Sequence, residues 1–112
     1  MWYIASMFKK RHRLTAREFD QYFKSGRRVH SPAFTLIYHY AEGEYKVAMV
    51  VPKKVVKTAV KRNLLRRRLL HILRPIIAEH QGIFIFIAKK NAANGSVAEL
   101  QAELTEIVGR VI

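Results

Sequence analysis

At residues 83–88 the chain reads Ile83-Phe84-Ile85-Phe86-Ile87-Ala88, an apolar run without a polar member. Five of the six residues are β-branched or aromatic, which favours a strand, and six residues are too few for a buried helix. Apolar side chains at both odd and even positions predict burial on both faces of a sheet. This apolar run is far shorter than the ~18 residues of a membrane-spanning helix.

Two further strands lie upstream, in runs rich in β-branched and aromatic residues. The first covers residues 33–40 and the second covers residues 45–51. Residues 42–44 read Glu-Gly-Glu, which is a turn sequence, so we interpret the two strands as a hairpin. Val29 and its neighbours predict a short edge strand that stops before Pro32, because proline has no N–H to donate to a sheet.

The first helix is predicted by a capping box at Thr15-Ala16-Arg17-Glu18. In this motif the threonine hydroxyl and the glutamate carboxylate accept from the unpaired amides at a helix start. Phe19, Tyr22 and Phe23 follow at helical spacing, and Gly26 is expected to supply the left-handed residue that ends a helix over residues 16–25.

Two longer helices follow. Thr58 is expected to cap a helix from Ala59 to about Leu73, after which Pro75 starts a new short turn. Ser96-Val97-Ala98-Glu99 is a second capping box. An apolar stripe at helical spacing continues after it, made of Leu100, Leu104, Ile107, Val108 and Val111. The predicted order is α-β-β-β-α-β-α, an α+β class.

Charge is segregated along the chain. Its 112 residues include 21 Lys and Arg against 8 Asp and Glu, for a formal net charge of +13. No acid occurs between Glu44 and Glu79, an interval that holds ten bases. Such segregation costs self-repulsion, so it indicates a polyanionic partner more than a merely soluble basic surface. We expect nucleic acid and no membrane, since binding to an anionic membrane surface needs a helix with a broad free apolar face.

Residue types also restrict the chemistry. The chain has no cysteine, which excludes disulfides, Cys-ligated zinc and thiol nucleophiles. The apolar opening at residues 1–8 precedes its positive charges instead of following them, so we expect no signal peptide and a cytoplasmic location. The five histidines are scattered and no carboxylates pair closely outside the turn at Glu42 and Glu44. We therefore expect no catalytic and no metal-binding residue in this chain.

The helix from residue 59 onward carries the densest basic cluster. At 100° per residue, Arg62, Asn63, Arg66 and Arg67 project from one face, while Leu65, Leu69, Ile72 and Leu73 lie on another. Guanidinium groups hold phosphates at two points, and the asparagine adds a neutral donor and acceptor for a 2′-OH or a base edge. Lys53, Lys54 and Lys57 precede the helix, and Lys61 lies in its first turn. This pattern predicts docking on an RNA backbone; the plainer alternative is a solvated basic face.

At these residues the sequence resembles the protein subunit of bacterial ribonuclease P. The family's basic motif is matched by Lys53-Lys54, Ala59-Val60, Arg62-Asn63-Leu64 and Arg66-Arg67. The resemblance continues at Phe8 to Leu14, Glu18 to Gly26 and Ile87 to Ala92, in family order. Within the helix three positions depart from the motif: Leu64 and Leu70 stand where the family has arginine, and Arg68 where it is apolar. Just before the helix, Lys57-Thr58 stands where the family has Gly-Asn. Leu64 and Arg68 are one turn apart, and we interpret them as having exchanged roles.

The resemblance implies a fold and a domain boundary. The family is a two-layer α/β sandwich of the ribosomal-protein-like type, whose mixed four-stranded sheet contains a left-handed β-α-β crossover. Crossovers of this kind are right-handed in ≈ 98% of cases. Since the resemblance begins at Phe8, we expect residues 1–7 to be an N-terminal extension and residues 8–112 to form one domain.

The resemblance also implies a function. The chain would be a ribonuclease P subunit, one protein monomer with one catalytic RNA subunit, and the RNA would cut the 5′ leader from precursor tRNA with Mg²⁺ that it holds itself. Residues implied to bind the RNA subunit are Lys53, Lys54, Lys57, Lys61, Arg62, Asn63, Arg66 and Arg67. Residues implied to bind the leader are Phe19, Phe23, Phe34, Lys89 and Lys90. The aromatic members could instead be core residues.

Two other functions remain open at this point. A ribosomal or general RNA-binding structural protein would share the basic helix but would need no leader cleft. A protein-only nuclease would need its own metal-binding carboxylates, and residues 45–78 contain none.

Overall fold

The computed structural model describes residues 9–112. A short turn η1 (Lys10–His12) is followed by the elements α2 (Ala16–Ser25), β1 (Arg27–His30), β2 (Phe34–His39), β3 (Tyr45–Val50), α3 (Ala59–Ile77), β4 (Gly82–Ala88), α4 (Lys90–Asn94) and α5 (Val97–Val111). The predicted order of main elements is confirmed; η1 and α4 are short additions to it. The extension expected at residues 1–7 lies outside the described residues.

The strands form one mixed sheet in the order β1-β2-β4-β3. Strand β4 pairs antiparallel with β2 and parallel with β3. The predicted hairpin of β2 and β3 is therefore wrong, because β4 lies between them. The apolar run of β4 explains this order. A strand with apolar side chains on both faces is most stable inside the sheet, with a neighbouring strand on each edge and helices covering both faces.

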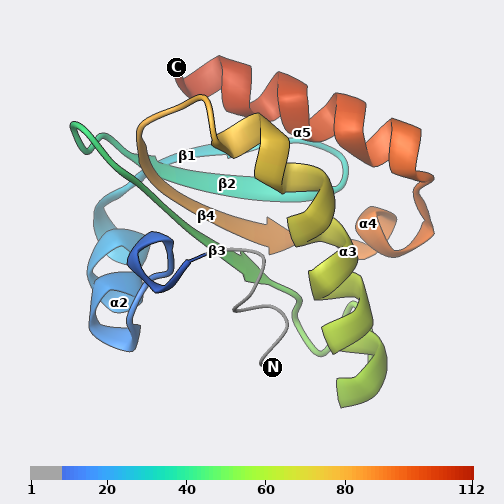
Figure 1. The fold of residues 1–112 in the computed structure, drawn as a ribbon. Helices are drawn as coiled ribbons and strands as arrows, with labels where there is room; N and C mark the ends of the chain where they lie inside the picture. The colour runs from blue at the N-terminus through green and yellow to red at the C-terminus, as the bar shows by residue number, and fades with distance from the viewer. Residues whose placement is uncertain (1–8) are drawn as a thin grey trace.

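The crossover from β3 through α3 to β4 has the unusual hand. Figure 1 shows α3 in front of the sheet, with β3 and β4 both running toward the right and β4 above β3. A right-handed connection in this view would place the second strand below the first. The crossover is left-handed, as the family resemblance implied, and the expected α/β sandwich is confirmed.

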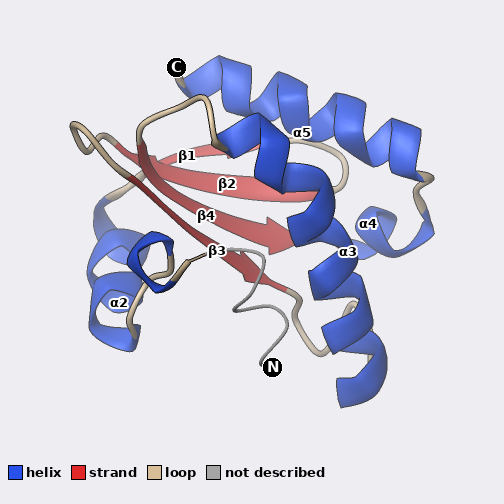
Figure 2. Cartoon of the chain, in the orientation of Figure 1, coloured by secondary structure: helices blue, strands red, loops and turns tan. Residues whose placement is uncertain are grey.

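The two faces of the sheet are covered unequally (Figure 2). Helices α3 and α5 pack on one face, over a fully buried core that includes Phe84, Phe86 and Leu36. Helix α2 lies on the other face, where a side chain added at Gly26 would come within 2.4 Å of Ile37. Gly26 has a φ of −74°, so the predicted left-handed cap is wrong; close approach of α2 to the sheet is what requires glycine here.

Helix α3 also differs from its prediction at the C-terminal end. It continues through Pro75 to Ile77 as one helix of 19 residues instead of ending near Leu73. Proline removes one helical hydrogen bond, to the carbonyl of His71, but both residues are exposed and water can satisfy that oxygen. Beyond the proline, Ile77 is fully buried, which holds the last turn on the core. No helix within residues 9–112 is both long and apolar enough to cross a membrane.

Candidate nucleic-acid interface

The basic face of α3 begins at a loop of lysines. Lys53 and Lys54 lie in a turn closed by a hydrogen bond from Val55 N–H to the Pro52 carbonyl at 3.0 Å, and both are exposed, as is Lys57. Thr58 then caps α3, since its hydroxyl accepts from Lys61 N–H at 3.3 Å. The structure thus places four predicted RNA-binding lysines on the surface around the start of α3.

Arg62 is held against the same loop. Its Nη1 donates to the carbonyls of Val56 at 3.1 Å and Lys57 at 2.7 Å. These contacts fix the direction of the guanidinium plane at the start of the helix. An arginine placed in this way loses less conformational entropy when it binds a phosphate than a freely rotating one.

One turn further along, Arg66 donates to the Asn63 side-chain oxygen at 2.6 Å. Burial, and secondarily the nearby charge of Arg62, lower the pKa of the Arg66 guanidinium, which stays charged in any case because arginine titrates far above neutral pH. The contact leaves the Asn63 amide nitrogen as the part of that side chain available to donate to RNA. Arg67 is half-buried beside this pair.

The three departures from the family motif are separated by the structure. Leu70 is buried in the core, so this position does not belong to the basic face. Leu64 and Arg68 both line one groove on the far side of α3, next to α4. Arg68 Nη2 donates to the Gly95 carbonyl at 3.3 Å, which turns this arginine toward the connection between α4 and α5 and away from Asn63 and Arg66.

Lys61, Arg62 and Arg66 of this face form no ion pair with an acid of residues 9–112. Glu18 is paired with Lys46 at 2.5 Å, and Glu106 is paired with Arg110 at 2.8 Å. The Lys46 hydrogen bond lowers the pKa of Glu18, and the Glu18 hydrogen bond raises the pKa of Lys46. The surface of α3 therefore keeps a positive field for a polyanion.

A second candidate surface is the aromatic pair on α2. The rings of Phe19 and Phe23 stack at 5.5 Å between centroids, and both are half-buried. Arg28 of β1 lies over the Phe23 ring at 4.8 Å and donates to the Phe23 carbonyl at 2.9 Å. Two rings that keep part of their faces accessible beside a guanidinium are suited to stacking with unpaired bases.

Phe34 does not join this pair, so its predicted role as a leader contact is wrong. Its side chain is 0% exposed and packs edge-on against Phe86 at 6.5 Å in the core beneath α3 and α5. Successive residues of a strand point to opposite faces, and α2 packs on the face of Ile37. Phe34 therefore lies on the face away from Phe19 and Phe23, where no base can reach it.

The sheet residues that do share the α2 face were not predicted as site residues. One row of them crosses the four strands: His30 pairs with Thr35, Thr35 with Ile87, and Ile87 with Val50. Ile87 and Val50 are half-buried, and the His30 ring nitrogen lies 3.0 Å from the Thr35 hydroxyl. The alternation of side chains along residues 33–40 indicates which residues share a face of the sheet. It would predict this row only if the face covered by α2 were known.

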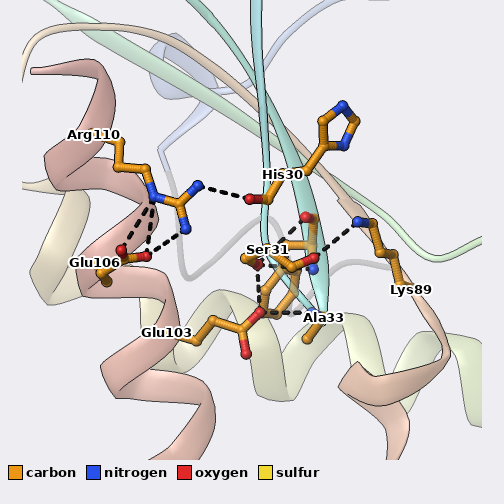
Figure 3. Close-up of polar contacts among 8 residues, drawn as sticks. His30, Ser31, Ala33, Lys89, Glu103, Glu106 and Arg110 are labelled. Atoms are coloured by element: carbon orange, nitrogen blue, oxygen red, sulfur yellow. Dashed lines mark hydrogen bonds and ion pairs between the residues drawn. The ribbon is translucent and has the colours of Figure 1, made fainter.

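Lys89 and Lys90 follow β4, two and three residues after Ile87 of this row. Lys89 Nζ donates to the Ser31 carbonyl at 2.8 Å, and Lys90 is exposed. Figure 3 shows Glu103 of α5 reaching the same loop, where its carboxylate accepts from the Ser31 hydroxyl and from Ala33 N–H. The loop between β1 and β2 is thus fixed from two sides, and one ammonium N–H bond fixes the position of Lys89.

The acidic side chains of the described residues are dispersed, and several of them are engaged in contacts with the fold. Within residues 9–112 no three His, Asp or Glu side chains converge on a point where they could hold a metal ion. Glu18, Glu103 and Glu106 are each engaged in the contacts given above.

Comparison with known proteins identifies the family of this chain. A family model described as Ribonuclease P matches residues 8–112. The chain belongs to the ribonuclease P protein family. A ribonuclease P protein component of Nitratiruptor sp. is 31% identical over 102 residues, which cover 87% of this chain and 88% of that protein. The corresponding protein of Desulfosudis oleivorans is 36% identical over 107 residues, covering 92% and 88%.

Solved structures of the family share the fold. The RNase P protein of Staphylococcus aureus superposes with a TM-score of 0.77 at 19% identity, covering 89% of this chain and 94% of that one. The protein of Thermotoga maritima gives a TM-score of 0.74 at 23% identity, covering 88% and 96%. As a family member, the chain is a subunit of ribonuclease P, a tRNA-processing endoribonuclease, and its partner is the RNA subunit of that ribonucleoprotein.

Proposed function

We propose that this ribonuclease P subunit binds the catalytic RNA through the basic face of α3 and the 5′ leader of precursor tRNA through the α2 side of the sheet. The observation that carries the first half is that Lys61, Arg62 and Arg66 of α3 form no ion pair with an acid of residues 9–112. The second half is supported by the Phe19–Phe23 pair and the half-buried row that includes Ile87 and Val50. Stacking tolerates any base sequence, which suits a subunit that must accept many leaders.

The division of labour follows from the side chains present. The chain supplies cations, hydrogen-bond donors and aromatic faces, which bind and orient RNA. Mg²⁺ belongs in this proposal to the RNA subunit, whose phosphates supply hard oxygen ligands. One protein monomer with one RNA subunit, acting in the cytoplasm on precursor tRNA, is the assembly we propose.

The test is cleavage of labelled precursor tRNA at low Mg²⁺ by a bacterial ribonuclease P RNA, with and without this protein. We expect little cleavage by the RNA alone, cleavage at the mature 5′ end when the protein is added, and none by the protein alone. Cleavage by nuclease-pretreated protein alone would overturn the proposal. Binding to the RNA subunit without any increase in the rate of precursor tRNA cleavage would also overturn the proposal, because a general RNA-binding structural protein would behave in that way.

A further inference from the structure

A groove lies on α3 beside the basic face described above and shares Lys61 with it. It has a volume of about 470 Å³ and runs between α3 and α4. Its apolar lining includes Leu65, which is buried, Ala93, which is half-buried, and Leu64, which is 51% exposed. A single exposed leucine is ordinary on a protein surface, but one that forms the wall of an apolar groove of this size provides a contact surface for a small ligand.

The rim of the groove is cationic and polar. Lys61 and Arg68 both line it, and they lie seven residues apart on one helix, which is about 10 Å along the axis. Asn94 of α4 lines it as well and offers an amide donor and acceptor. Arg68 is held at its place by the hydrogen bond to the Gly95 carbonyl.

An apolar groove with a cation at each end is complementary to a nucleotide, the repeating unit of the RNA subunit. A nucleotide has a flat base that binds apolar surface and phosphates on either side that bind Lys and Arg. A base inside a duplex exposes only its edges, so the nucleotide that fits a groove must be unpaired. A protein segment is a less suitable occupant of the groove, because it would need acidic side chains at the cationic rim and apolar side chains against the walls.

We propose that this groove binds one unpaired nucleotide of the RNA subunit, with its base against Leu64 and its flanking phosphates at Lys61 and Arg68. The inference rests on the proposed function. The RNA subunit is the source because the groove lies on α3, whereas the surface proposed for the leader lies on the opposite face of the sheet, beside α2. In this chain Leu64 supplies the apolar wall and Arg68, one turn later, supplies the cation.

The chain contains no cysteine, so a single one can be introduced as an attachment point. Asn94→Cys carrying an aryl azide should crosslink on illumination of the holoenzyme to one short stretch of the RNA subunit. Gln101→Cys, exposed on α5, is the matched control and should give no discrete crosslink. A crosslink from position 94 to precursor tRNA instead of the RNA subunit would overturn the proposal.

Affinity measurements give an independent readout. Leu64→Gln keeps size and charge but removes the apolar wall, and it should weaken RNA-subunit binding about three- to tenfold, as expected for losing the burial of half a leucine side chain. Its control, Val60→Gln, changes a residue one turn earlier that is 70% exposed and does not line the groove, so affinity should change less than twofold. Both variants should melt like the wild type and keep its salt dependence.

The two failures are distinguishable. If the wild-type protein does not bind the RNA subunit, the proposed function is wrong. If the wild type binds but Leu64→Gln behaves like Val60→Gln, or position 94 gives no crosslink, the groove proposal is wrong and the function stands.

Discussion

Helices α3 and α5 pack against each other on the same face of the sheet, and both bury leucines in the same core. Their outer surfaces are opposite in charge. Helix α3 carries Lys61, Arg62, Arg66, Arg67, Arg68 and Arg74 without an acid, whereas α5 carries Glu99, Glu103 and Glu106 with Arg110 as its one base. Each of these three glutamates accepts a hydrogen bond within the chain.

This difference indicates that the polar side chains of α5 serve to stabilise the fold. The polar groups of α5 cap its own start, fix the loop after β1 and pair with each other, so its surface is satisfied within the molecule. Helix α3 buries its apolar face in the same way, but it carries several bases and no acid, at a cost in self-repulsion. RNA binding as proposed above would offset that cost, and we infer that α3 was selected for binding as well as for folding.

The largest expected effect is on the free energy of unfolding, when a leucine of the core shared by α3 and α5 is truncated. Leu69→Ala in α3 and Leu104→Ala in α5 each truncate a side chain that is fully buried in the common core. Each should lower the free energy of unfolding by about 2–5 kcal/mol, measured by urea denaturation. If one of them costs less than about 1 kcal/mol, the two helices do not contribute equally to the core and the comparison fails.

The next effect separates α3 from the aromatic pair on α2. Phe23→Ala should weaken holoenzyme affinity for precursor tRNA by about 1–3 kcal/mol, because one stacking contact is lost, and leave mature tRNA unaffected. Tyr22→Ala is the control: its ring packs on His39 at 4.9 Å, away from the stacked pair. Equal weakening of both tRNAs by Phe23→Ala, together with a large loss of stability, would show that Phe23 is a core residue.

The smallest effect concerns the helix starts. Ser96 and Glu99 form a complete capping box on α5, whereas the corresponding position of α3 is Lys61, a base at the positive end of the helix dipole. Lys61→Glu should therefore stabilise the free protein by about 0.3–1 kcal/mol while weakening RNA-subunit binding. The mirror variant, Glu99→Lys, should lower thermal stability without weakening RNA binding. A Lys61→Glu protein that binds RNA as well as wild type would remove Lys61 from the interface.

Local pattern was enough to predict most elements of this fold. The capping boxes at Thr15 and Ser96 and the apolar run of β4 appear where they were expected, because a cap or a two-sided apolar strand is encoded in neighbouring residues. The order of strands was not predictable in this way. The turn at residues 42–44 suits a hairpin locally, and only the need of β4 for two neighbours separates β2 from β3.

The candidate site could be predicted where it depends on residue type. It was harder to predict where it depends on which face of a helix or of the sheet a side chain occupies. Arg62, Asn63 and Arg66 lie together, as predicted, because helical spacing fixes their direction. Phe34 was misassigned because alternation shows that Phe34 and Leu36 share a face without showing which face α2 covers. Leu64 and Arg68 could not be placed from the sequence, since the groove that they line is formed only when α4 packs beside α3.

The central claim is that the basic face of α3, and not positive charge in general, binds the RNA subunit. The measurement is the slope of log affinity against log salt for the triple variant Lys61→Gln, Arg62→Gln and Arg66→Gln. Its control, Arg11→Gln, Lys24→Gln and Arg110→Gln, removes the same three charges from exposed positions outside α3. We expect the α3 variant to flatten the slope by about 2–3 units, since each lost phosphate contact contributes roughly 0.7–0.9, and the control by less than about one unit. Equal slopes for the two variants would contradict the account.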